Sequence, residues 1–184
     1  MDNKLIPRES IATLARYYTE HPGPTGVLIG AEVGVYDGEH ADTILANIAG
    51  LSRLYLVDIW APNDGYPDWD KQQHWDDVYQ RVRQKYANDY RVMIFKGDSP
   101  KIASALEDSC LSFVYIDANH YYESVLADLK AWWGKIEPNG WMLGHDWTTD
   151  GVAKAVIEFT SSIGVQPTLS SNGIEWWFQN KVGI

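Results

Sequence analysis

The chain has 184 residues, of which 25 are Asp or Glu and 15 are Lys or Arg, so its formal net charge at pH 7 is −10. This length predicts one domain over residues 1–184, and 45% hydrophobic with 22% charged residues is ordinary for a globular protein and excludes disorder. The acidity argues against nucleic acid or an anionic membrane as a partner, because such binders carry a basic patch and no cluster of Lys and Arg is visible.

The chain contains a single cysteine, Cys110, which excludes an internal disulfide and a metal site built from several cysteines. The first ten residues lack the apolar core of a secretory signal, and no run of about 18 apolar residues could span a membrane. We therefore expect a soluble, cytoplasmic protein that acts on a small-molecule substrate.

From the N-terminus onward, the apolar pattern alternates between helical and strand spacing. Residues 1–25 are a lead-in and a first helix, whose apolar face is marked by Ile11, Leu14, Ala15 and Tyr18. Short apolar runs predict five buried strands, over residues 27–35, 54–59, 91–95, 111–117 and 141–144. Helices are predicted over residues 41–49, 72–87, 100–106, 121–133 and 152–163. The composition of residues 60–71 predicts a loop, and Pro-Asn-Gly at 138–140 predicts a turn.

The end of the chain departs from this alternation. Two strand-like runs, 165–169 and 174–178, flank an Asn-Gly pair and predict a hairpin. The repeated strand–helix units before it predict an α/β fold, a doubly wound, Rossmann-like sheet that is mostly parallel with helices on both faces. Such sheets bind ligands at the carboxyl ends of their strands, so the polar residues at those ends are the functional candidates.

The first two strands end in residues that suit a nucleoside-binding crevice. Glu32, Gly34 and Gly38 follow the spacing Glu-x-Gly-x-x-x-Gly. Gly34 allows a close backbone or ligand approach, and Gly38 can adopt a positive φ. Asp58 ends the second strand 20 residues beyond Gly38, where an acid can accept both hydroxyls of a ribose. The structural alternative is a tight turn beside a buried glutamate, with a solvated acid at a loop entrance.

The third strand is followed by Gly97, Asp98 and Ser99. The Asp98 carboxylate can accept a hydrogen bond from an adenine amino group. It can equally cap the helix that begins at Ser99, so this residue alone does not separate a binding role from a structural one.

The fourth and fifth strands end in Asp117, with His120 just beyond, and in His145 with Asp146. Adjacent strands lie about 4.8 Å apart, so Asp117 and Asp146 would share one spot and favour a cation or a shared proton. Oxygen ligands suit Mg²⁺, Mn²⁺ or Ca²⁺, and a histidine ligand is better tolerated by Mn²⁺ or Fe²⁺. Consecutive side chains point to opposite faces, which favours Asp146 over His145. The alternative is a polar strand end at Asp117 and a helix start at His120.

Taken together, these residues resemble the class I S-adenosylmethionine (SAM)-dependent methyltransferases, and more narrowly the macrocin O-methyltransferase-like and cephalosporin hydroxylase-like branch. The resemblance covers residues 26–178, and its most specific stretch is 113–123, FVYIDANHYYE. It continues through Asp128-Leu129, Trp132-Trp133, Pro138-Asn139-Gly140-Trp141 and Gly144-His145-Asp146. Ala118 stands where the family usually has glycine, and His145 stands in place of an acid, which weakens the expected preference for Mg²⁺.

The resemblance implies a SAM site spread over the strand ends. Glu32, Gly34 and Gly38 would surround the methionine end, Asp58 would bind the ribose, Asp98 and Ser99 would contact the adenine, and Asp117 would also belong to this set. The family fold is a seven-stranded sheet with an antiparallel last strand, in agreement with the hairpin expected from the residues alone.

The implied activity is SAM-dependent O-methylation of a small hydroxylated acceptor, such as a sugar, a glycoside or another ring-bearing metabolite. A divalent metal, Mg²⁺ or Mn²⁺, on Asp117, Asp146 and His145 would lower the pKa of the acceptor hydroxyl, and His120 would act as general base beside Asp117. Two alternatives stay open: a metal-dependent oxygenase or hydrolase on the same fold, and a nucleoside-binding domain without turnover.

Aromatic residues predict the acceptor side, because flat rings suit sugars and ring systems. Trp60, Tyr66 and Trp69 belong to the substrate-side loop 60–71, and Trp147 lies across the site. The alternative is that some of these rings belong to the core or to a dimer surface. A homo-oligomer whose neighbouring subunit supplies a lid is compatible with the short N-terminal region. The many acids near the strand ends favour a neutral or cationic acceptor over a phosphorylated one.

Overall fold

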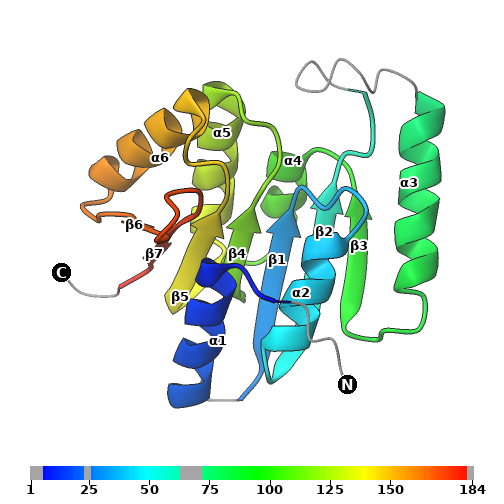
Figure 1. The fold of residues 1–184 in the computed structure, drawn as a ribbon, viewed down its shortest axis with the longest axis horizontal. Helices are drawn as coiled ribbons and strands as arrows, with labels where there is room; N and C mark the ends of the chain where they lie inside the picture. The colour runs from blue at the N-terminus through cyan, green and yellow to red at the C-terminus, as the bar shows by residue number, and fades with distance from the viewer. Residues whose placement is uncertain (1–5, 23–25, 63–71, 182–184) are drawn as a thin grey trace.

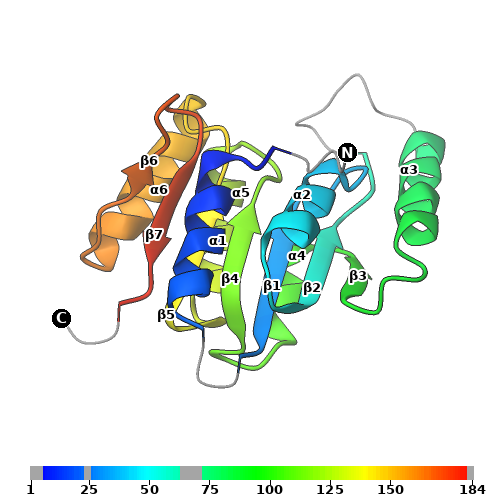
Figure 2. The ribbon, with the colours of Figure 1, turned by 60° about the horizontal axis from the view of Figure 1, so that its bottom comes forward.

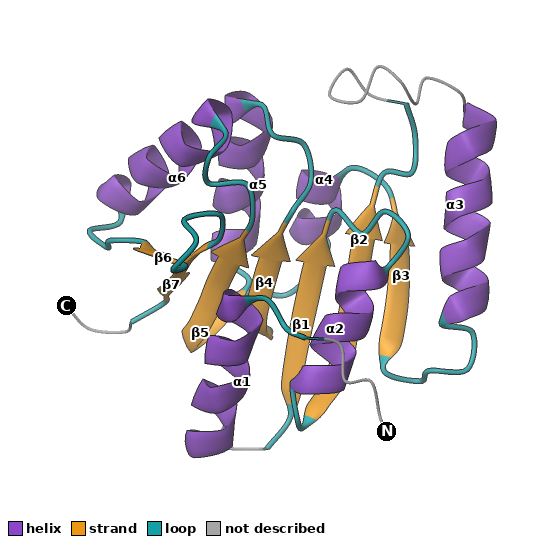
Figure 3. Cartoon of the chain, viewed as in Figure 1, coloured by secondary structure: helices purple, strands orange, loops and turns teal. Residues whose placement is uncertain are grey.

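The computed structural model describes residues 6–22, 26–62 and 72–181, in which a central sheet has helices on both faces (Figure 1). The strands are β1 (Leu28–Val33), β2 (Leu51–Asp58), β3 (Val92–Lys96), β4 (Leu111–Ile116), β5 (Ile136–Gly144), β6 (Thr168–Leu169) and β7 (Trp176–Gln179). The helices are α1 (Glu9–Glu20), α2 (Glu39–Asn47), α3 (Gln72–Lys85), α4 (Ser99–Ser104), α5 (Tyr122–Trp133) and α6 (Asp150–Ser162). Strands and helices alternate from α1 to α6, as the colours of Figure 3 show.

The seven strands lie in the order β3-β2-β1-β4-β5-β7-β6. The neighbours from β3 to β5 pair in parallel, whereas β7 is antiparallel to both β5 and β6. This arrangement confirms the predicted α/β fold, a doubly wound, Rossmann-like sheet with an antiparallel last strand. The strand order reverses between β1 and β4, which is the point where such sheets open a ligand crevice at their carboxyl ends.

Two hydrophobic cores fill the layers on either side of the sheet. Helices α1, α2 and α3 contribute to one core and α4, α5 and α6 to the other. Figure 2 shows α1 and α2 in front of the sheet and α5 and α6 behind it. Every residue of β4 is buried, which explains the nearly continuous apolar run of this central strand. The longest described helix, α3, has 14 residues, and no helix in the described ranges is long and apolar enough to cross a membrane.

The segments that leave β1 and β4 are in direct backbone contact at Gly34. This residue has φ +90°, and a Cβ there would lie 2.1 Å from the carbonyl oxygen of Asp117. The Asp117 N–H in turn donates to the carbonyl oxygen of Val33 at 2.7 Å. A glycine is therefore needed for Asp117 to lie against the turn that follows β1.

The predicted turn at residues 138–140 is wrong, because β5 runs through it. Asn139 has φ +66°, and the pairing of β5 with β4 shifts register between Leu111 and Phe113. The Asn139 N–H donates to the carbonyl oxygen of Asn180 at 2.7 Å. The Pro-Asn-Gly segment is thus an irregularity inside a long strand, and the C-terminal segment pairs with the backbone there.

Candidate functional site

A cavity of about 930 Å³ opens at the strand-order reversal, beyond the carboxyl ends of β1, β2 and β4. The predicted cofactor residues that line it are Glu32, Gly34, Asp58, Asp98, Ser99 and Asp117. Its volume falls in the range of about 300–1,000 Å³ that is typical of small-molecule sites. The fold therefore gathers strand-end residues from distant parts of the sequence around one space.

Gly38 is the exception among the predicted cofactor residues, because it does not line this cavity. It is the N-cap of α2 at φ +79°, and a Cβ there would lie 2.8 Å from the Tyr86 hydroxyl oxygen. Its carbonyl oxygen accepts hydrogen bonds from the Tyr86 hydroxyl (2.7 Å) and the Lys85 ammonium (3.0 Å). Gly38 allows the end of α3 to pack on the start of α2, and its contact with a methionine end stays a prediction.

Asp58 is half-buried, and backbone donors occupy its carboxylate. Its Oδ2 accepts the N–H groups of Val35 (2.8 Å) and Tyr36 (2.9 Å), and its Oδ1 accepts the N–H of Trp60 (2.8 Å). Burial raises the pKa of Asp58, and these N–H groups oppose that rise. The side chain ties the turn after β1 to the turn after β2, and the ribose contact predicted for it must share an oxygen that already accepts a backbone N–H.

Glu32 is 1% exposed and forms a pair with His40, whose Nδ1 lies 2.8 Å from Glu32 Oε1. Burial raises the pKa of Glu32 well above its usual range and lowers the pKa of His40 to about 3. Glu32 Oε2 and His40 Nε2 are buried without a hydrogen-bond partner in the described part of the chain. Because both residues line the cavity, a polar ligand group would complete their hydrogen bonding.

Arg8, which is not among the predicted site residues, reaches the cavity from the position just before α1. Its Nη1 donates to the Tyr115 hydroxyl at 2.7 Å and to Asp117 Oδ2 at 2.8 Å. Burial disfavours the charge of Arg8, but Tyr115 and Asp117 outweigh it, and its pKa is raised. Arg8 lies 107 residues from Tyr115, so no local pattern in the sequence signals this contact.

A second buried carboxyl group, that of Asp128, lines the cavity beside Ser99. The Ser99 hydroxyl bonds to Asp128, and its oxygen accepts the Trp132 Nε1–H at 2.7 Å. Burial raises the pKa of Asp128 to about 6, and its Oδ1 has no partner within the described residues. Asp128 lies on the buried face of α5, so an acid on the apolar face of the predicted helix 121–133 is the signal that could have identified it.

Asp98 lines the same part of the cavity and is half-exposed. It occupies the N-cap position of α4, yet its side chain makes no capping hydrogen bond. The structural alternative considered for Asp98, a helix cap, is therefore absent from the described structure.

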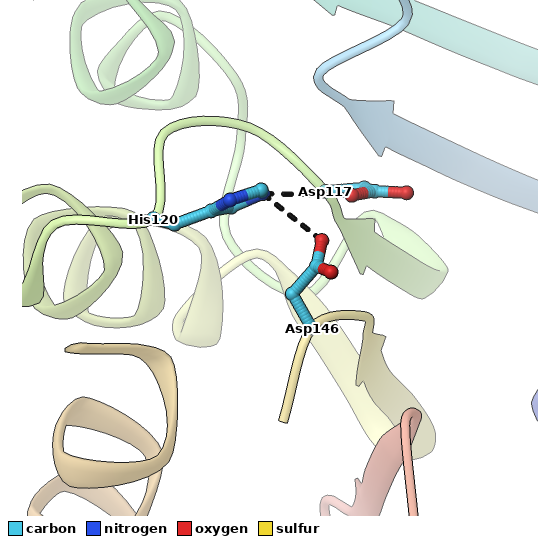
Figure 4. A group of neighbouring side chains, drawn as sticks. All are labelled: Asp117, His120 and Asp146. Carbon is cyan, nitrogen blue, oxygen red and sulfur yellow. Dashed lines mark ion pairs between the residues drawn. The ribbon is translucent and has the colours of Figure 1, made fainter. Parts of the chain in front are cut away.

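Asp117, His120 and Asp146 point toward one another, from the end of β4, the turn before α5 and the turn after β5 (Figure 4). His120 Nε2 lies 3.0 Å from Asp146 Oδ2 and 4.0 Å from Asp117 Oδ1. The hydrogen bond to Asp146 raises the pKa of His120, and the hydrogen bonds from the two histidines, His120 and His145, hold the pKa of Asp146 well below its usual range. One ligand atom from each member of this group lies within 4.8 Å of the others, which suits a divalent cation.

This candidate group contains His120, whereas the predicted metal ligands were Asp117, Asp146 and His145. His145 Nδ1 lies 3.1 Å from Asp146 Oδ2 and so holds that carboxylate from outside the group. Asp146 has φ +57°, which breaks the alternation of a regular strand. That is why the neighbouring side chains of His145 and Asp146 meet, whereas strand geometry predicts that they point apart.

The aromatic residues that were predicted to contact the acceptor lie in different environments. Trp60 is fully buried and its Nε1–H donates to the carbonyl oxygen of Tyr36 at 2.8 Å, so it is a core residue and the predicted substrate contact is wrong. Trp147 is half-buried, packs against the core on the α5 side and does not line the 930 Å³ cavity. Tyr66 and Trp69 lie outside the described residues.

A second cavity, of about 540 Å³, is lined by residues 119–122 and 148–151. Asn119 lines both cavities, and His120 lines the second one, so the group of Figure 4 stands where the two meet. Tyr121, which is 53% exposed, and Tyr122 are the aromatic residues of this wall. These two residues are not among the predicted acceptor contacts, which were assigned to the aromatic residues of loop 60–71 and to Trp147.

Solved structures of other proteins share this fold. The O-methyltransferase NovP aligns over 94% of this chain and 78% of its own, with 15% identity and a TM-score of 0.68. A protein from Corynebacterium glutamicum aligns over 97% and 84%, with 14% identity and a TM-score of 0.67. Spermidine synthase from Thermotoga maritima aligns over 95% and 59%, with 13% identity and a TM-score of 0.60. Enzymes named for different activities thus share this fold, and identities this low establish the fold alone.

The amino-acid sequence carries the family assignment. A search of curated proteins found no match. Residues 31–147 match a family model described as a methyltransferase domain, and this segment runs from β1 to the turn after β5. It contains Glu32, Asp58 and all three residues of Figure 4, and it covers more than half of the chain. The chain therefore belongs to this methyltransferase domain family.

Proposed function

We propose that the protein transfers a methyl group from SAM to a hydroxyl oxygen of a small, ring-bearing acceptor. The observation that carries this proposal is the position of Asp117 between the two cavities. Its Oδ2 accepts from Arg8 at the wall of the 930 Å³ cavity, and its Oδ1 faces His120, which lines the 540 Å³ cavity. A donor in the larger space and an acceptor in the smaller one would meet at this residue.

The donor set of the larger cavity suits SAM, which supplies a methyl group on a cationic sulfonium. Glu32 Oε2 and Asp128 Oδ1 are buried carboxyl oxygens without a partner in the described ranges, and both residues line this cavity. Glu32 would hold the methionine end, while Asp98, Ser99 and Asp128 would surround the adenine. The excess of acids around this space favours a cationic ligand over an anionic one.

In this proposal His120 accepts the proton of the acceptor hydroxyl. A hydroxyl becomes a good nucleophile as its proton leaves, and a base that titrates near neutral pH serves this step best. Asp146 Oδ2, 3.0 Å from His120 Nε2, stabilises the imidazolium that forms, and His145 keeps that carboxylate in place.

Instead of His120 acting as a base, a divalent cation bound beside it could activate the acceptor hydroxyl. Asp117, His120 and Asp146 would hold it, and a bound cation lowers the pKa of a hydroxyl that it contacts. His120 Nε2 faces both carboxylates, and a neutral imidazole has one nitrogen lone pair, so His120 cannot ligate a cation and accept a proton at once. The metal dependence of turnover therefore separates the two roles of His120.

The acceptor side of the proposal rests on the smaller cavity. Tyr121 and Tyr122 offer rings against which a sugar or a phenol can pack. The carboxylates of Asp146 and Asp150 lie at this side, so neutral or cationic acceptors are expected to bind better than phosphorylated ones.

The test is a panel of hydroxylated sugars and phenols incubated with SAM, with release of S-adenosylhomocysteine as the readout. We expect turnover with at least one acceptor, and we expect His120→Ala to lower it by about 100-fold or more while SAM binding is kept. His21→Ala, an exposed histidine at the end of α1, is the matched control and should retain full turnover.

Chelator treatment followed by Mn²⁺ addition completes this experiment. Loss of turnover on chelation and its return with Mn²⁺ would assign His120 as a ligand, whereas unchanged turnover would assign it as the base. Product formation that needs iron and proceeds without SAM would contradict the proposal and favour an oxygenase or hydrolase. SAM binding without turnover of any acceptor would favour a nucleoside-binding domain.

A further inference from the structure

The 930 Å³ cavity is lined by many acids and by one strongly basic side chain. The acids are Glu32, Asp37, Glu39, Asp58, Asp98, Asp117, Glu123 and Asp128. Arg8 is the single Arg or Lys among the described residues of this wall. An anionic group on any ligand of this cavity is therefore repelled along most of the wall and attracted at one place.

Arg8 has hydrogen-bonding capacity left after its contacts within the protein. A guanidinium carries five N–H donors in a planar fork. Both described hydrogen bonds of Arg8, to Tyr115 and to Asp117, use Nη1 alone. Its Nε and Nη2 make no hydrogen bond to the described residues, and its side chain is 31% exposed. This leaves the edge of the fork that a carboxylate binds through two parallel bonds.

The position of Arg8 is fixed by a contact between α1 and the segment just before β7. Glu175, which is 3% exposed, accepts the N–H of Glu9 through Oε1 (3.1 Å) and the N–H of Ser10 through Oε2 (2.8 Å). Glu9 Oε2 in turn accepts the N–H of Ser171 at 2.8 Å. The first turn of α1 is thus held on both sides directly after Arg8, so the guanidinium is presented to the cavity from a rigid base.

Arg8 and the pair of Glu32 with His40 meet at the ring of Tyr115, whose centroid lies 5.6 Å from the guanidinium carbon of Arg8 and 4.2 Å from the centroid of the His40 ring. The positive charge of Arg8 works against the rise in the pKa of Glu32 that burial causes, and it helps to lower the pKa of His40. Glu32 Oε2 has no partner in the described ranges. The buried Glu32 oxygen can accept a hydrogen bond from a cationic group, and Nε and Nη2 of Arg8 can donate to an anionic group in the same part of the cavity. Such a pair of sites suits the ammonium and the carboxylate of an amino acid.

We propose that Arg8 binds the α-carboxylate of the ligand whose α-ammonium pairs with Glu32, namely the methionine end of SAM. The inference rests on the proposed function and adds to it a determinant for the carboxylate. Arg8 keeps its hydrogen bonds to Tyr115 and Asp117 through Nη1 and offers Nε and Nη2 to the ligand. The protein is then expected to discriminate between SAM and an analogue that lacks only the carboxylate.

The experiment is isothermal titration calorimetry with SAM and with decarboxylated SAM, which keeps the adenosine, the sulfonium and an amine. The full-length protein is expected to bind SAM about 10- to 100-fold more tightly, the worth of one charge-assisted pair. Arg8→Gln is expected to lower SAM affinity by that factor and leave the affinity for decarboxylated SAM within about twofold. Arg8→Lys should recover part of the preference, because a lysine is a single point charge without the fork.

Arg16→Gln is the matched control, because Arg16 is an exposed arginine on the same helix. It should keep the full preference for SAM. Equal affinity of the unaltered protein for the two ligands would overturn the inference without any variant being needed. An equal loss of both affinities in Arg8→Gln would also overturn it, since Arg8 would then act only through Asp117. Failure of the unaltered protein to bind either ligand would instead overturn the proposed function, and the inference with it.

Discussion

The carboxylate of Asp58 accepts the backbone N–H of Tyr36 at 2.9 Å, across 22 residues of sequence. The same oxygen accepts the N–H of Val35 at 2.8 Å, so one side chain holds the turn that follows β1. Asp58, at the end of β2, therefore stabilises the turn after β1 even without a ligand. Its substitution is expected to affect the stability of the fold as well as the cavity.

Asp58→Asn tests this task. Whichever way the new amide turns, at least one buried backbone N–H loses its acceptor, so the free energy of unfolding should fall by about 1–3 kcal/mol. Urea denaturation measures the difference. Asp77→Asn on the exposed side of α3 is the matched control, because within the described residues its carboxylate accepts a hydrogen bond from Gln73 alone, and it should change stability by less than about 0.5 kcal/mol. Equal stability of the two variants would contradict the task assigned to Asp58.

A pair of glycine substitutions tests the contact between the segments after β1 and β4. Gly34→Ala places a Cβ against the Asp117 carbonyl oxygen, whereas Gly164→Ala, also at positive φ, meets nothing within 4 Å. Both variants bear the cost of a left-handed residue, about 1–2 kcal/mol. Gly34→Ala should lose about 2 kcal/mol more, because backbone must move. Thermal unfolding compares them, and similar losses would show that the close approach is not needed.

Asp128 gives the stability of the protein a predictable dependence on pH. Its pKa is about 6 in the folded state and about 3.9 in an unfolded chain. The folded protein therefore holds this proton more tightly, so the group favours folding below about pH 4 and loses that contribution as the pH rises to about 6. Asp128→Asn keeps the shape and removes the titration.

The expected result for Asp128→Asn is a gain in unfolding free energy, on the order of 2 kcal/mol at about pH 7.5 and close to none at about pH 4. Denaturation at both pH values measures it, with Asp77→Asn as the control that should show no such difference. A gain of the same size at both pH values would mean that the carboxyl group of Asp128 does not carry the pH dependence.

The group of Figure 4 makes a prediction about Mn²⁺ binding that separates its two histidines. His120→Ala removes a ligand and should weaken Mn²⁺ binding by about 100-fold, whereas His145→Ala removes only the partner of Asp146 and should weaken it by about 10-fold. Titration of Mn²⁺ followed by electron paramagnetic resonance measures both. The reverse order would restore His145 as a ligand, as the resemblance to the methyltransferase family implied.

The sequence could predict those parts of the fold and the site that depend on local pattern and on the geometry of parallel sheets. The apolar runs at 54–59 and 111–117 became strands because both faces of the sheet are covered, so a buried strand needs no polar alternation. Asp117 and Asp146 came together because the carboxyl ends of neighbouring parallel strands share one edge of the sheet.

Other features depend on contacts between distant segments, and no local pattern reports them. Arg8 is directed by Glu175, and its partner Asp117 lies 109 residues away. Trp60 belongs to the predicted loop 60–71, but its indole N–H donates to the carbonyl oxygen of Tyr36, which allows the ring to be buried. His120, and not His145, joins Asp117 and Asp146 in the candidate metal group because the chain turns at Asp146, which has a positive φ. The residue type alone does not predict this backbone conformation.

The contact of Glu175 with Ser10 joins segments 165 residues apart. Helix α1 comes before every strand in the chain, yet the acceptor that fixes its first turn belongs to the segment just before β7. A chain without the segment around Glu175 would lack this support for Arg8. A ligand that uses Arg8 therefore favours the complete fold, because it binds that state and not a partly folded one.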